Sequence, residues 1–159
     1  MRSEALEKAL APYAAFEDGK RLRAGFTTGT TAAAAALAAA TLLFSGERLE
    51  AVSIRTPVGA VLPIPIESLE LVTEDGVTSA VAAVRKDAGD DPDVTDGILF
   101  YARVGTEDSA GGDTAEETEI PVVFRAGPGI GTVTKPGLDQ PVGEAAINRV
   151  PRNMIAAAV

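Results

Sequence analysis

The 159-residue sequence contains no cysteine and no histidine, and each absence narrows what the chain can do. Without cysteine there are no disulfides and no thiolate zinc sites. Without histidine, Ser-His-Asp catalysis, an imidazole general base and most transition-metal sites are excluded. Any proton transfer must therefore use a carboxylate, a lysine, a tyrosine, water or the substrate itself.

Aromatic residues are also scarce, at 4% of the sequence, although 46% of all residues are hydrophobic. A core must therefore be built from alanine, valine, leucine and isoleucine. The length suits one domain, and we expect residues 1–159 to form a single one. We expect no run long enough to span a bilayer, because the alanine-rich stretch 32–44 is too short and too weakly hydrophobic. The first residues lack the pattern of a secretory signal, so we expect a cytoplasmic protein.

The sequence has few cations, and its formal net charge is −9. This excess of carboxylates argues against broad binding to nucleic acid or to anionic membranes. An anionic small molecule could bind only where local arginines and backbone N–H groups override the average field. Homo-oligomer formation remains open.

The residue pattern predicts an α+β fold, with a mixed or antiparallel sheet and a central alanine-rich helix. A first helix is expected over 1–17, broken at Asp18-Gly19. The central helix is expected over 32–43, capped by Thr27, Thr28 or Thr30 and stopped by Gly46. Strands are expected at 52–56, 60–66, 69–73, 77–85, 98–104, 120–125 and 132–134. We expect a solvated acidic loop at 107–119 and a second loop at 141–150. A last helix is expected to begin at Pro151. Because this helix has no stop signal, we expect the chain to be the N-terminal part of a longer protein.

The most distinctive string is the acidic run 86–97, which holds five carboxylates, two glycines and a proline. Like charges this close repel, so the run is either an unusual tight turn or part of a site. Asp87, Asp90 and Asp91 are the candidate catalytic carboxylates. A hard cation could bind there, but the spacing of a calcium loop is absent, and we assign no metal.

A second string, Gly25 to Thr31, leads into the alanine-rich helix. Its glycines, threonine hydroxyls and helix N–H groups could cradle an anion. It is not a P-loop, since no Lys-Ser or Lys-Thr follows at the required spacing. An ordinary capped helix is the alternative.

A third glycine-rich string contains Gly127, Gly129 and Gly131. It leads into an expected strand rather than a helix, which argues against dinucleotide binding. A turn beside a bound ligand is the better interpretation. Lys135 either faces a substrate carboxylate or is simply an exposed turn lysine.

Taken together and in order, Gly25–Thr30, Lys86–Thr95 and the stretch from Gly131 through Asn148 to Arg152 resemble the cobalt-precorrin-5B (C1)-methyltransferases of anaerobic cobalamin biosynthesis. The resemblance covers roughly 22–155. It implies transfer of a methyl group from S-adenosylmethionine to C1 of cobalt-precorrin-5B, giving cobalt-precorrin-6A. It also implies a two-domain enzyme, of which this chain is the N-terminal domain and whose C-terminal α/β domain is absent here.

On this basis a set of binding residues is expected around substrate and cofactor. Arg21, Arg23 and Lys135 would bind the carboxylates at the edge of the macrocycle. The full set is Arg21, Arg23, Thr27, Thr28, Gly29, Thr30, Thr31, Gly89, Asp93, Thr95, Gly129, Gly131, Thr134, Lys135 and Gly137. Two alternatives stay open, a non-catalytic tetrapyrrole- or anion-binding module and a kinase-like domain that binds phosphates at 25–31.

Overall fold

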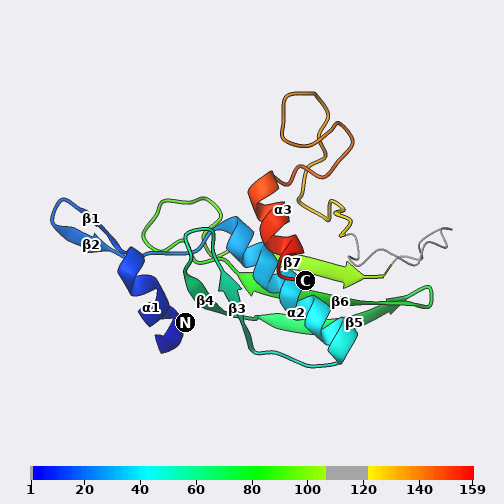
Figure 1. The fold of residues 1–159 in the computed structure, drawn as a ribbon, viewed down its shortest axis with the longest axis horizontal. Helices are drawn as coiled ribbons and strands as arrows, with labels where there is room; N and C mark the ends of the chain where they lie inside the picture. The colour runs from blue at the N-terminus through cyan, green and yellow to red at the C-terminus, as the bar shows by residue number, and fades with distance from the viewer. Residues whose placement is uncertain (1, 107–121) are drawn as a thin grey trace.

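The computed structural model describes residues 2–106 and 122–159 and shows an α+β arrangement around one central helix. This helix, α2 (Thr28–Ser45), lies against a three-stranded antiparallel sheet of β5 (Ser68–Glu74), β6 (Val77–Arg85) and β7 (Leu99–Gly105) (Figure 1). A second antiparallel pair is formed by β3 (Ala51–Arg55) and β4 (Val61–Pro65). The predicted fold class is therefore confirmed.

The α2 helix forms where the sequence predicts it, for reasons visible at both ends. Thr27 is the N-cap, and its side chain accepts a hydrogen bond from the backbone N–H of Thr30. Gly46 ends the helix in the left-handed conformation (φ 73°), which glycine adopts without a steric penalty. The helix packs against strands and against α3 (Arg149–Ala156), because its alanines let the neighbouring backbones approach closely.

The core lies between α2, the sheet and the β3–β4 pair. Along β6, alternate residues face α2, as the period of a strand requires. Both predicted hairpins form, with the registers Val52↔Ile64 and Leu71↔Ala80. The buried core is made of small and aliphatic side chains, with Phe26 as its one buried aromatic residue among those described: Leu6, Leu10, Phe26, Ala33, Ala34, Ala35, Ala38, Ala39, Leu42, Val52, Ile54, Ala60, Leu62, Ile64, Ala80, Ala82 and Val84.

The expectation that no run could cross a membrane needs a correction. By length and composition alone, the 18 residues of α2, with a mean hydropathy of 1.4, meet the requirement for a membrane span. The helix is longer than the predicted stretch 32–44, because it also includes the threonine-rich residues 28–31. However, 61% of this helix is buried inside the fold, and the core helix of a water-soluble domain passes the same test.

The expected first helix over 1–17 is wrong beyond its first turns. The helix α1 spans Glu4–Leu10 and is followed by a 3₁₀ turn, η1 (Ala11–Tyr13). Pro12 explains the stop, since proline has no N–H and its ring clashes with an earlier carbonyl in a continuing helix. The chain then forms a hairpin of β1 (Ala15–Glu17) and β2 (Lys20–Leu22) around the predicted break at Asp18-Gly19.

Near the C-terminus three expectations change. Residues 122–125 form no strand, and the rest of that expected strand, like the acidic loop 107–119, lies outside the described residues. The expected strand 132–134 is a single bridge between Thr132 and Ala145. The last helix begins at Arg149 rather than Pro151, because proline is tolerated throughout a first turn whose N–H groups have no helical partner.

Candidate functional site

The chain just before α2, residues 23–26, crosses the acidic run 86–97 in direct backbone contact. The backbone N–H of Phe26 donates to the carbonyl of Asp87 at 2.8 Å, and that of Asp90 donates to the carbonyl of Arg23 at 3.0 Å. Glycine makes this approach possible on both sides. A Cβ on Gly25 would lie 2.1 Å from the carbonyl carbon of Ala88, and one on Gly89 would lie 2.2 Å from the carbonyl oxygen of Arg23.

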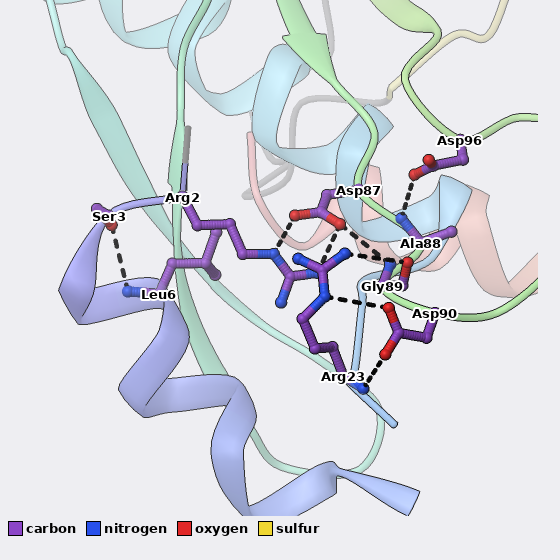
Figure 2. A network of polar contacts seen from close by, with 9 residues as sticks. All are labelled: Arg2, Ser3, Leu6, Arg23, Asp87, Ala88, Gly89, Asp90 and Asp96. Carbon is purple, nitrogen blue, oxygen red and sulfur yellow. Dashed lines mark hydrogen bonds and ion pairs between the residues drawn. The ribbon is translucent and has the colours of Figure 1, made fainter. Parts of the chain in front are cut away.

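Two arginines fasten the acidic run to the N-terminal region (Figure 2). Arg2, which precedes α1, forms an ion pair with Asp87 through two nitrogens, one of them 2.5 Å from Oδ1. Arg23, which follows β2, donates to Asp90 from its backbone N at 2.9 Å and from Nε at 3.1 Å. In Figure 2 the two guanidinium groups reach the same part of the loop from different segments. Residues 86–97 are thus held from two directions.

These contacts shift the carboxylates toward their charged form. The hydrogen bond from Arg2 lowers the pKa of Asp87, with help from the backbone N–H of Gly89. The pKa of Asp90 is lowered first by the backbone N–H of Arg23 and then by its guanidinium group. Both acids are therefore ionised at neutral pH and already have partners within the protein.

The same loop is closed on itself by a buried lysine. Lys86 is only 4% exposed, and its Nζ forms an ion pair with Asp93 and donates to Thr95 Oγ1 at 2.6 Å. Asp93 also accepts from the backbone N–H of Thr95, and the contact with Lys86 is the main reason why its pKa lies well below the usual range. Asp96 accepts from the backbone N–H of Ala88 at 2.8 Å. Asp93 and Thr95, expected at a ligand, serve to shape the loop.

Asp91 differs from the other acids in this run. It is exposed, and within the described part of the chain its carboxylate has no hydrogen-bond or ion-pair partner. Among the three candidate catalytic residues, Asp87 and Asp90 are thus occupied by arginines, and Asp91 is free to meet a ligand.

The predicted anion cradle at the start of α2 is partly used by the helix itself. Thr30 and Thr31 are buried, and the Thr31 hydroxyl donates to the Thr27 carbonyl at 2.9 Å. Gly29 is buried against α3, where a Cβ would lie 3.5 Å from Pro151. Thr27 and Thr28 are exposed, so only these two can present hydroxyls at this end of the helix.

The third string lies apart from this cluster. Figure 1 shows the loop that contains Lys135 above α3 and far from the β1–β2 hairpin that carries Arg21. The expected residues Gly129, Gly131, Thr134, Lys135 and Gly137 are all exposed. This segment is held by short-range bonds, such as Val133 N–H to the Glu144 carbonyl at 2.8 Å, and by Arg152, which lies 4.9 Å from the centre of the Phe124 ring. The structure therefore brings Arg23, the α2 start and the acidic run together, but not Lys135.

Sequence reasoning missed Arg2 and Asp96. Arg2 lies 85 residues from Asp87 in the sequence, and no local pattern signals such a pair. Asp96 belongs to the acidic run, and its position one residue before Gly97 was the available sign of a turn. Within the described ranges, no three carboxylates gather as a metal site would require.

Comparison with known proteins identifies the relationship. Cobalt-precorrin-5B C(1)-methyltransferases of Treponema denticola and Pseudomonas putida are each 50% identical to this chain, over 87% and 85% of its length. The Moorella thermoacetica protein of the same name is 45% identical over 88%. The matches cover 36%, 33% and 34% of these relatives, so the chain spans about a third of the length of the curated relatives it matches. No solved structure matches the chain. The CbiD family model matches residues 15–159, and the chain belongs to this family.

Proposed function

We propose that this chain supplies the first part of an enzyme that methylates C1 of cobalt-precorrin-5B in cobalamin biosynthesis, in the cytoplasm. S-adenosylmethionine would be the methyl donor and cobalt-precorrin-6A the product. The observation that carries the proposal is identity of about half of all residues to proteins of that name over nearly the whole chain. A C-terminal domain, not part of this chain, would complete the enzyme, since the relatives are about two and a half times as long.

The chemistry of this reaction suits a chain without histidine. The bond between the sulfonium sulfur and its methyl carbon breaks as the bond from that carbon to C1 forms. The electron-rich ring supplies the electron pair of the new bond at C1, and the electron pair of the broken bond stays on sulfur, which becomes a neutral thioether. The macrocycle releases one proton to solvent, so that it gains one methylene overall. Such a displacement needs alignment and desolvation rather than a strong general base.

Roles can be divided among the candidate residues by what the fold leaves free. Asp87, Asp90 and Asp93 hold the loop, and Gly89 lets it meet Gly25. Asp91, Thr27 and Thr28 are exposed beside this crossing and are available to a ligand. Lys135 would act from a separate segment, against a different carboxylate of the macrocycle.

The direct test is turnover by the full-length protein with S-adenosylmethionine and cobalt-precorrin-5B, followed by mass spectrometry of the corrinoid. A product heavier by one methylene supports the proposal, and an unchanged corrinoid contradicts it. D91N should lower turnover at least about tenfold without lowering the melting temperature if Asp91 contacts the reacting groups.

A second candidate is a non-catalytic tetrapyrrole- or anion-binding module. It is favoured by the exposed Thr27 and Thr28 at the N-terminus of α2, where hydroxyls and the helix end can meet an anion. An absorbance titration of the 159-residue chain with cobalt-precorrin-5B separates the two. Saturable binding to this chain, with no turnover even by the full-length protein, would favour the binding module.

A further inference from the structure

A groove of about 580 Å³ lies between α1 and the β1–β2 hairpin, on the N-terminal side of the acidic run. The apolar residues that line it include Leu10, Leu22 and Ala24. Charged side chains of both signs also line it: Arg2, Lys8, Arg21 and Arg23, and Glu4 and Glu7. All the residues that line it lie between positions 2 and 24.

Two of the four cations are committed to the fold. Arg2 is paired with Asp87 and Arg23 with Asp90, which fixes the two walls of the groove to the same loop. The other two keep most of their donors. Arg21 makes one hydrogen bond, to the carbonyl of Ala11 at 3.1 Å, and Lys8 has no ion-pair partner in the part of the chain that is described.

The acids complete the charge pattern. Glu4 has no ion-pair partner among the described residues. Glu7 lies close enough to Arg2 for its negative charge to help raise the pKa of the arginine. The free cations and these carboxylates balance, so the groove carries no net charge. A polyanion gains little from such a groove, because each carboxylate that Arg21 attracts is opposed by Glu4 and Glu7.

The size of the groove also favours a small ligand over a tetrapyrrole. The volume lies within the 300–1,000 Å³ range of small-molecule sites. This open groove could hold a ligand with an amino-acid end and one ring system, whereas a whole tetrapyrrole would extend far outside it. A ligand with an anionic and a cationic group on a partly apolar body matches both the size and the charges.

We propose that this groove binds the zwitterionic methyl donor, S-adenosylmethionine, with Arg21 and Lys8 binding its carboxylate and Glu4 and Glu7 facing its ammonium or sulfonium group. The choice of donor rests on the proposed function. The groove itself rests on the contacts above. It places the donor beside the acidic run, with Asp91 exposed on that run.

The test is calorimetric titration of the 159-residue chain with S-adenosylmethionine, S-adenosylhomocysteine and uroporphyrin as separate ligands. We expect saturable binding of S-adenosylmethionine, weakened at least tenfold by R21Q and several-fold by K8Q. R21K should recover part of the loss. The double variant E4Q/E7Q should weaken S-adenosylmethionine more than S-adenosylhomocysteine, because only the former carries the sulfonium charge.

The matched control is R55Q. Arg55 is an exposed arginine on β3 that is not among the residues lining the groove, and this variant should bind like the parent. Melting temperatures of all variants check that the fold is kept. Absence of binding overturns the proposal, because every residue that lines the groove, and both carboxylates that hold its walls, are present in the 159-residue chain.

Binding that R21Q and K8Q leave unchanged also overturns it, while leaving the proposed function standing with a donor site elsewhere. Preferred binding of uroporphyrin, strengthened by E4Q/E7Q, would make the groove a polyanion site instead and equally refute the proposal. Failure of the full-length protein to methylate cobalt-precorrin-5B would be a separate result, against the proposed function itself.

Discussion

Residues 86–97 and residues 126–143 are both glycine-rich strings of a kind that suggests a ligand site, yet they are built in opposite ways. In the first, Gly89 is pressed against the backbone of residues 23–25, and four of the five carboxylates have partners. In the second, a Cβ on Gly127, Gly129, Gly137 or Gly143 would meet nothing within 4 Å. The same composition therefore serves close packing in one place and an exposed, locally held segment in the other.

Adding one methyl group in each region tests this structural difference most directly. G25A forces a Cβ into the backbone of residues 87–88, and we expect it to lower the free energy of unfolding by about 3 kcal/mol or more. G127A, in open space and without a left-handed φ, should change it by less than about 0.5 kcal/mol. Urea denaturation measures both.

A second pair controls for the left-handed conformation. Gly89 and Gly129 have φ of 74° and 85°, but only Gly89 meets backbone atoms. G129A should therefore cost about 1–2 kcal/mol from strain alone, and G89A clearly more. Equal losses in the two regions would show that the crossing of 23–26 and 87–90 does not limit the fold.

The buried lysine offers the next largest effect. D93N leaves the buried Lys86 ammonium without a charged partner, and we expect the melting temperature to fall by about 5 °C or more. K86M removes the buried charge and keeps the volume, so it should cost less than half as much. D139N, on the exposed segment, is the matched control and should leave the melting temperature unchanged. A larger fall in melting temperature for K86M than for D93N would refute the roles assigned to Lys86 and Asp93.

Lowering the pH should have a smaller effect on stability, which acts through the carboxylates of the acidic run. Asp87, Asp90 and Asp93 have pKa values lower in the folded chain than in the unfolded chain, so their ionised forms stabilise the fold. This contribution is complete above the unfolded pKa, near 4, and is lost as the pH falls through the lower folded values. We expect constant stability from pH 7 to about pH 5 and a decline below about pH 4.

The variant D87N/D90N gives this prediction its control. It should be less stable than the parent at pH 7 but should show a shallower decline below pH 4. Chemical denaturation at pH 7, 5, 4 and 3 measures the difference, and parallel curves for the two proteins would contradict it.

The smallest expected effect on stability is that of K135Q. Lys135 is exposed on the open segment, so the melting temperature should stay within about 1 °C of the parent. If this lysine binds a substrate carboxylate, the Michaelis constant of the full-length protein for cobalt-precorrin-5B should still rise several-fold. An unchanged Michaelis constant would leave Lys135 as an ordinary turn residue.

Local signals accounted for most of the elements from residue 27 to residue 105. The cap at Thr27, the stop at Gly46 and the alternation along β3 and β4 are short-range patterns, which a sequence carries directly. The predicted helix over 1–17 is too long because its hydrophobic spacing continues past Pro12, where the helix itself cannot continue. The missing strands near 122–134 had suitable residues but have no neighbouring strand to pair with in the described structure.

The site was predictable in its parts but not in its assembly. The acidic run and the string 25–31 stand out in the sequence, but nothing local says that they touch. Likewise, the pairing of Arg2 with Asp87 depends on the whole fold. This is why carboxylates that look catalytic in sequence prove to be engaged by arginines, and why the exposed Asp91 is distinguished only by the structure.

The pairing of Arg2 with Asp87 has a consequence for the order in which the chain can fold as it is made. Contacts separated by 85 and 67 residues close only when the acidic run has left the ribosome. At about 5–20 residues per second, the N-terminal helix waits several seconds with Leu6 and Leu10 exposed. Contacts this distant in sequence also slow folding in general. The first residues to be synthesised would thus be among the last to reach their final place.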